Sequence, residues 1–125
     1  ALDSAEPARG ILRVTRHPVM WGFVLWGVAH LLNNGDLKSV IFFGTFTVLA
    51  LAGTRLIDAK RARTHGELWA AYVAKTSNLP FQAIIEGRNR FVFAEIGIWR
   101  TLAAVLVFGA LLAGHEALFG VSPAP

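Results

Sequence analysis

Hydrophobic residues gather in three segments of the chain, separated by polar stretches. The first covers residues 18–32, with a proline suited to the first turn of a helix and an Asn-Asn-Gly sequence that ends it. The second, residues 39–57, has no charge before Arg55, and the third covers about residues 96–121. These runs predict membrane-spanning helices, although the first, at about 22 Å, is short for a hydrocarbon core of about 30 Å.

A further helical element is predicted between the second and third segments. Leu68, Trp69, Tyr72 and Val73 recur at helical spacing, and the sequence LPFQAII follows after a Ser-Asn break. This pattern is typical of an amphipathic helix and loop at a membrane surface. The predicted fold is all-α, a polytopic transmembrane helix bundle with three spans and an interfacial amphipathic helix. The alternative, a small soluble helical hairpin, is disfavoured by the long apolar run.

Composition and charge agree with a membrane setting. Apolar residues make up 54% of the 125 residues, which is high for a soluble domain. The net charge of +4 comes from basic residues that flank the apolar runs, so nucleic acid is not an expected partner, and the lipid bilayer is. An apolar small molecule is a further expected partner. With no cysteine, the chain has neither disulfides nor thiolate metal sites.

The distribution of lysine and arginine predicts an orientation. Basic residues cluster before the first segment and after the second, which places both clusters on the cytoplasmic side, in a bacterial inner membrane. Residues 1–15 are then a cytoplasmic N-terminal segment and residues 58–95 a cytoplasmic interfacial segment, whereas the loop 33–38 and the C-terminus face outward. The chain begins without methionine, and we expect residues 1–125 to be a single membrane domain lacking N-terminal helices.

Polar residues at the predicted cytoplasmic ends of the first two helices are the first candidates for a site. Arg16 and His17 precede Pro18, and Gly22 and Gly27 thin one side of the helix that follows. Asp58, His65 and Glu67 are predicted to lie within reach of His17. An ordinary solvated helix end is the alternative interpretation. The sequence contains no glycine-rich phosphate loop and no HExxH zinc motif.

Several of these stretches resemble a known family. RVTRHPVMWGFVLWGVAHLL, DAKRARTHGELWAAYVAKTSNLPFQAIIEGR and the late helix with His115 are similar to the NnrU family of polytopic membrane proteins, over about residues 10–120. The family includes 15-cis-zeta-carotene isomerases, and its bacterial members are linked to denitrification and nitric oxide metabolism. The resemblance implies either that link or the cis-trans isomerisation of a carotenoid-like lipid, and the isomerase implies haem b.

The isomerase pattern also implies roles for individual histidines. His30 matches a proposed haem ligand, and His17 matches the histidine of the Arg-His-Pro motif. Gly27 departs from the pattern, because a cysteine proposed to take part in redox-linked ligation occupies that place. Thirteen residues of helix separate His17 from His30 by about 20 Å, so the two cannot ligate one iron. We expect the second ligand to be His115, with Glu116 orienting it, or a histidine of absent helices.

A more distant likeness gives an alternative function. The Arg-His-Pro motif, a glycine four residues later and a Gly-x-x-Trp-x-x-Tyr sequence are similar to isoprenylcysteine and phospholipid methyltransferases, which bind S-adenosylmethionine. Met20 and the pair Ile57-Asp58 depart from the residues usual there. A non-enzymatic haem or regulatory membrane protein is a third alternative. The candidates under methyl transfer are Arg16, His17, Gly22 and Asp58.

Overall fold

The structure is a computed structural model that describes Leu2 and residues 6–123, and every regular element in this part of the chain is helical. This confirms the prediction of an all-α fold. The chain divides into two units, Ala1–Val92 and Phe93–Pro125. The first unit contains the 3-10 helix η1 (Gly10–Arg13) and the helices α1 (Pro18–Asn33), α2 (Leu37–Lys75) and α3 (Gln82–Ile85). The second contains α4 (Phe93–Ile96), α5 (Ile98–Ala113) and α6 (His115–Phe119).

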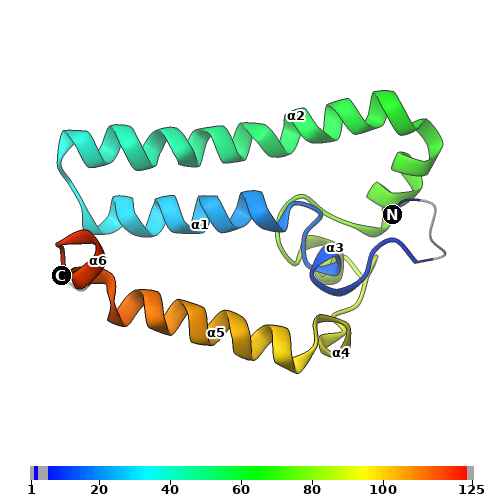
Figure 1. Cartoon of the computed structure of the whole chain (residues 1–125). Helices are drawn as coiled ribbons and strands as arrows, with labels where there is room; N and C mark the ends of the chain where they lie inside the picture. The colour runs from blue at the N-terminus through cyan, green and yellow to red at the C-terminus, as the bar shows by residue number, and fades with distance from the viewer. Residues whose placement is uncertain (1, 3–5, 124–125) are drawn as a thin grey trace. The chain divides into compact units, whose positions relative to one another are not determined.

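Helices α1 and α2 form an antiparallel hairpin (Figure 1). The bounds of α1 agree with the first predicted segment, and Asp36 caps α2 by accepting a 3.0 Å hydrogen bond from the Ser39 amide. The helices approach closely at Gly27, where a Cβ atom would lie 2.2 Å from Thr47 Oγ1 and 3.1 Å from the Phe43 carbonyl oxygen. The hairpin therefore depends on the absence of a side chain at this one position.

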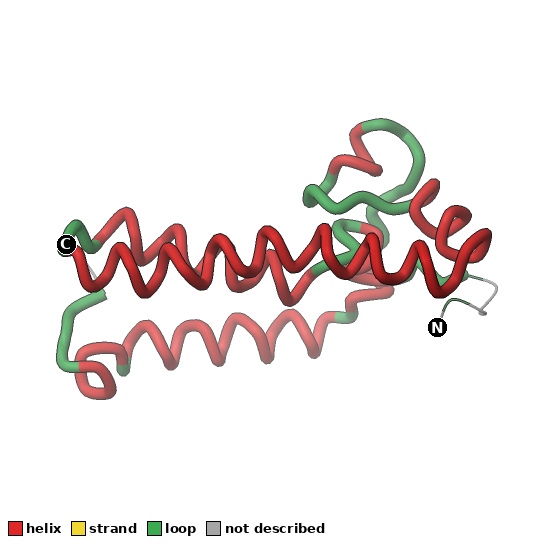
Figure 2. The backbone as a smooth tube through the Cα atoms, turned by 90° about the horizontal axis from the view of Figure 1, so that it is seen from above, coloured by secondary structure: helices red, strands yellow, loops and turns green. Residues whose placement is uncertain are grey.

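Helix α2 continues beyond the second predicted segment. The second predicted segment ended near residue 57, whereas the helix continues to Gly66, where non-helical backbone divides α2. The further helix predicted around residues 68–73 is the part of α2 that follows this break. The middle of α2 is rich in Ala, Lys and Arg, which favour helix even where hydropathy falls. Gly66 has φ 47°, a value that glycine tolerates best. The last part of α2 turns away from its long first part (Figure 2). In the part of α2 after this break, Trp69 and Tyr72 are buried and pack with Ala8.

The second unit is interrupted where a continuous span over residues 96–121 was predicted. Gly97, at φ 86°, separates α4 from α5, and Gly114 separates α5 from α6. At Gly114 a Cβ atom would lie 3.1 Å from the Ala110 carbonyl oxygen. The predicted segment is therefore divided at Gly114 into α5 and α6, at a residue of low helix propensity.

One helix in the described part of the chain, α2, is long and apolar enough to cross a membrane. Helices α1 and α5 are apolar but have 16 residues each, about 24 Å of helix. The arrangement of three spans therefore stays a prediction.

Candidate functional site

A shared carboxylate joins the start of α1 to α2. Asp58 accepts hydrogen bonds from Arg16 Nε, at 3.0 Å to each carboxylate oxygen, and from Arg16 Nη2, at 2.6 Å to Oδ2. His17 Nε2 lies 2.6 Å from Asp58 Oδ1. The side chains of Arg16, His17 and Asp58 are 11%, 5% and 19% exposed. We name these three residues the polar cluster.

The polar cluster favours an ionised Asp58, which lies beyond the uncharged residues 39–54. Burial raises the pKa of this carboxyl, but the hydrogen bonds and positive charge of Arg16 and His17 outweigh burial and lower the pKa below its ordinary value. Because an ionised carboxylate can only accept hydrogen bonds, the proton in the contact with His17 lies on Nε2. Asp58 therefore fixes the tautomer and the orientation of the His17 ring.

The backbone that carries Arg16 and His17 is held by the loop after α2. The Arg16 amide donates to the Ser77 carbonyl at 2.9 Å, and the Phe81 amide donates to the Val14 carbonyl at 2.8 Å. The Thr15 hydroxyl donates to the Asn78 carbonyl at 2.6 Å. Residues 76–81 thus pair with the segment that leads into α1, and the Arg-His-Pro motif is placed by a loop about 60 residues away.

Asn78 connects this loop to both helices of the hairpin. Trp21 Nε1, on α1, donates to the Asn78 carbonyl at 2.7 Å. The Asn78 amide group donates to the Thr54 hydroxyl, on α2, at 2.8 Å, and Thr54 in turn donates to the Leu51 carbonyl. Since Thr54 is buried, these bonds satisfy polar groups that would otherwise be unpaired inside the unit.

Two further residues fix the end of α2. Arg88 Nη1 donates to the carbonyl oxygens of Ala74 and Thr76, at 3.0 and 2.9 Å, which are among the acceptors that a helix end leaves unpaired. Asn89 accepts from Arg13 Nη1 and donates to the Lys75 carbonyl, both at 2.8 Å. These bonds join the end of α2 to Arg88 and Asn89, so the segment between them is held at both of its ends.

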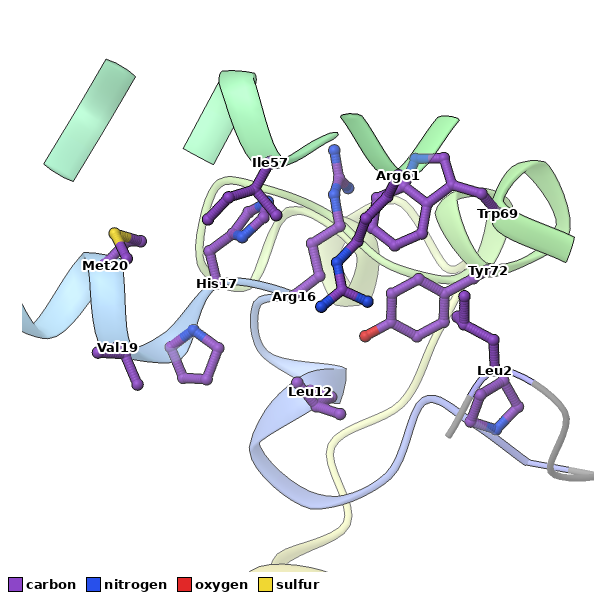
Figure 3. A pocket seen from close by; sticks show the side chains of 12 residues that line it. Leu2, Leu12, Arg16, His17, Val19, Met20, Ile57, Arg61, Trp69 and Tyr72 are labelled. Atoms are coloured by element: carbon purple, nitrogen blue, oxygen red, sulfur yellow. The ribbon is translucent and has the colours of Figure 1, made fainter. Parts of the chain in front are cut away.

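A cavity of about 320 Å³ lies beside the polar cluster (Figure 3). Its wall combines residues that precede α1, the first turn of α1 and both parts of α2. Most of the wall is apolar, with arginine, histidine and tyrosine as its polar members. The lining residues are Leu2, Pro7, Leu12, Arg16, His17, Pro18, Val19, Met20, Ile57, Arg61, Trp69 and Tyr72.

The structure brings together three of the residues singled out in the sequence and leaves others apart. Arg16, His17 and Asp58 are in direct contact. Gly22 is exposed, with no atom within 4 Å of a Cβ built there, and it does not line the cavity. His65 and Glu67 are exposed on α2, and His65 Nδ1 contacts Thr64 and the Arg61 carbonyl of its own helix. The expected reach of these two residues to His17 is not found among the described contacts.

His30 lies near the opposite end of α1 from the polar cluster. Its Nδ1 donates to the Trp26 carbonyl at 2.8 Å, which makes Nε2 the nitrogen with the lone pair when the ring is neutral. The ring stacks on Phe43 of α2, with ring centroids 4.5 Å apart, and lies 5.0 Å from Trp26. His115 belongs to the second unit, where its Nδ1 donates to the Val121 carbonyl at 2.8 Å. Within the described residues no three His, Asp or Glu side chains form a group that could hold a metal ion.

Sequence reasoning missed the residues that assemble the site. The polar Thr76-Ser77-Asn78 sequence within an apolar loop predicted a structured segment but not its pairing with residues 14–16. The part of the cavity wall formed by Trp69 and Tyr72 also escaped notice, because their helical spacing was attributed to a membrane surface. The signal that could have found them is the small, flexible Gly66 three residues before Trp69.

Comparisons with known proteins place these observations in a family. The chain is 37% identical over 81 residues to the chloroplastic 15-cis-zeta-carotene isomerase of Zea mays, and 38% identical over 80 residues to that of Arabidopsis thaliana. The alignments cover 65% and 64% of this chain but only 22% of each relative. No solved structure matches the chain. The family model described as NnrU protein matches residues 1–123, and the chain therefore belongs to the NnrU family.

Proposed function

We propose that this chain is part of a membrane enzyme that isomerises a cis double bond in a carotenoid-like polyene. The observation that carries the proposal is the identity of 37% over 81 residues with a 15-cis-zeta-carotene isomerase. Because the match covers 22% of that relative, the activity would belong to a longer protein of which this chain supplies one region.

The exposed surface supports the membrane setting. Large apolar side chains are exposed on α1, α2 and α5, and lipid is the environment in which such surfaces are stable. Examples on the three helices are Leu25, Val48 and Leu106. We propose the three-span arrangement described above, with the polar cluster at the cytoplasmic surface of a bacterial inner membrane. In this arrangement the polar cluster holds the start of α1, and the apolar surfaces face lipid and polyene.

The donor chemistry of this chain fits a haem whose iron His30 would hold. Ligating histidines commonly donate their other ring nitrogen to a carbonyl, which fixes the tautomer, and His30 donates Nδ1 to Trp26. His115, in the second unit, donates Nδ1 to Val121 in the same manner, so its neutral ring likewise carries the lone pair on Nε2. When bound, haem supplies one-electron and ligand-coordination chemistry. His30 would hold the iron, with its ring stacked on Phe43 and in contact with Trp26.

Isomer analysis in cells tests the activity. We expect the full-length protein, produced in bacteria that accumulate 15-cis-zeta-carotene, to deplete this isomer in the dark, as measured by liquid chromatography. Asp58→Asn should lower the conversion because it removes the carboxylate that holds Arg16 and His17. Asp36→Asn is the matched control, since asparagine caps a helix as well as aspartate. An unchanged isomer ratio with well-expressed wild-type protein contradicts the proposed activity.

Haem content tests the proposed ligand separately. We expect the full-length protein purified from haem-replete cells to show a Soret band, and His30→Ala to lose most of the bound haem. His65→Ala is the control, because His65 is exposed and contacts only its own helix among the described residues. If His30→Ala keeps the wild-type spectrum and haem content, His30 is not the ligand.

Methyl transfer has less support from the geometry. Binding of S-adenosylmethionine through Arg16 requires that the Arg16 guanidinium donate to the carboxylate of the ligand. In the structure, Nε and Nη2 of this guanidinium already donate to Asp58. We expect no saturable binding of S-adenosylmethionine in calorimetry. Binding that is lost in Arg16→Ala would favour methyl transfer over isomerisation. The non-enzymatic alternative and the link to nitric oxide metabolism stay predictions from the family resemblance.

A further inference from the structure

Two arginines line the cavity, and they differ in their partners. Arg16 is paired with Asp58, whereas Arg61 has no carboxylate partner in the part of the chain that the structure describes. The Arg61 guanidinium lies 5.8 Å from the centroid of the Trp69 ring, a distance at which the ring attracts and orients a cation. Figure 3 shows Arg61 and Tyr72 extending toward the same part of the cavity. The cavity therefore offers two donors, a guanidinium and a phenol, to an anion.

The remainder of the wall suits an alkyl chain. Leu12, Val19, Met20 and Ile57 line the cavity away from Arg61, and Val19 is 66% exposed, so the cavity opens along the apolar surface of α1. The volume of about 320 Å³ is at the lower end of the range for small-molecule sites. A free inorganic anion would leave most of this wall unused, and an uncharged polyene would make no use of the exposed Arg61 guanidinium.

We infer that this cavity binds an anionic membrane phospholipid, with the phosphate against Arg61 and Tyr72 and the beginning of an acyl chain against Val19, Met20 and Ile57. The inference rests on the membrane setting proposed above but not on the isomerase reaction. The site lies where the uncharged residues 39–54 of α2 give way to Lys60, Arg61 and Arg63, which is where lipid phosphates meet a membrane protein. The lipid would be a fixed component that seals the cavity beside the polar cluster.

Native mass spectrometry of the purified full-length protein tests the inference. The protein, in a neutral detergent, receives an equimolar mixture of phosphatidylglycerol and phosphatidylcholine with identical acyl chains. We expect wild-type protein to retain phosphatidylglycerol preferentially, and Arg61→Gln to lower this preference about tenfold, the effect of losing one charge-assisted hydrogen bond. Arg61→Lys, which keeps the charge, should retain most of the preference.

Arg63→Gln is the matched control. It removes the same charge two residues away, from an exposed side chain that does not line the cavity, and should leave the preference unchanged. Equal losses in Arg61→Gln and Arg63→Gln would show general surface attraction and overturn the inference. Equal retention of both lipids by wild-type protein would also overturn it, as expected if another protein segment fills the cavity.

Inorganic phosphate separates a lipid site from a simple anion site. Added at the concentration of the lipid, it should not displace phosphatidylglycerol, because it gains nothing from the apolar wall; displacement would overturn the inference. The lipid ratio is measured without substrate, so it is independent of the isomer analysis. Wild-type protein that isomerises its substrate but shows no lipid preference rejects the lipid site alone. Wild-type protein that shows the lipid preference but does not isomerise rejects the reaction alone.

Discussion

Asp58 connects two basic side chains that have no other shared partner among the described residues. Arg16 and His17 are adjacent in sequence, and both direct nitrogen atoms to the same carboxylate on α2. A carboxylate can accept several hydrogen bonds at once, whereas a neutral amide offers a single acceptor oxygen. The charge and the geometry of the cluster therefore both depend on this one side chain.

Asp58→Asn should destabilise the protein by about 2 kcal/mol, because it leaves Arg16 partly buried without its counter-charge; the exposure of the site keeps the effect below the 3–5 kcal/mol of a fully buried pair. Thermal unfolding of the full-length protein in detergent, followed by circular dichroism, measures the change. Asp36→Asn is the control and should unfold with the wild type. Equal melting temperatures for Asp58→Asn and wild type would contradict this account of the cluster.

The same pair of proteins should show a defined dependence on pH. Burial raises the pKa of Asp58, but the lowering by Arg16 and His17 is larger than this increase. The pKa in the folded protein is therefore below the unfolded value of about 3.9. The contribution of the carboxylate is then complete above about pH 5 and is lost as the pH falls through the folded pKa. The difference in melting temperature between wild type and Asp58→Asn should therefore shrink as the pH falls below about 4. A difference that grows on acidification has the wrong sign for this mechanism.

Among the secondary-structure elements, the α1–α2 hairpin is the most sensitive to a small change. A Cβ atom at Gly27 would overlap Thr47 Oγ1 and press against the Phe43 carbonyl oxygen, a backbone atom that cannot move aside freely. The cysteine that the isomerase pattern has at this place would meet the same two atoms in this chain. Position 27 therefore needs glycine for packing, whatever chemistry its relatives place there.

Gly27→Ala should cost about 1–3 kcal/mol of stability, as overpacking does, with part of the loss recovered in the double variant Gly27→Ala/Thr47→Ala. Gly22→Ala is the matched control on the same helix, where a Cβ has open space, and should be neutral or stabilising by up to about 1 kcal/mol. Melting temperatures of the four proteins check both expectations. A neutral Gly27→Ala would show that the helices lie further apart than the structure has them.

The elements also show what the sequence could predict. Proline at position 18 and the Asn-Asn-Gly stop define α1, because these residues act on the backbone locally. The helical continuation of α2 through residues 58–65 could not be inferred from hydropathy, which reports burial and not helix propensity. For the site, clustered charges at two helix ends indicated that Arg16, His17 and Asp58 could meet. The contribution of Asn78 depends on a loop conformation that no local pattern encodes.

At the scale of the whole molecule, the proposed topology can be tested across α2 alone. Single cysteines at Gly35, before α2, and at Arg63, after its apolar part, should react with impermeant reagents from opposite sides of the membrane, with Arg63 on the cytoplasmic side. Gly35 has open space for a side chain, and Arg63 is exposed. The predicted outward C-terminus at Ala124 lies outside the described residues. Labelling of both positions from one side would exclude α2 as a span.

The long-range pairing of the loop with the start of α1 has a consequence for biosynthesis. Arg13 contacts Asn89, 76 residues later, so a ribosome adding about 5–20 residues per second delivers the partner roughly 4–15 s after the arginine. During this interval Arg16 and His17 have been synthesised without the loop that positions them, and the basic end of α1 is still unattached. The polar cluster is therefore complete only after the loop has been synthesised and has paired with the start of α1.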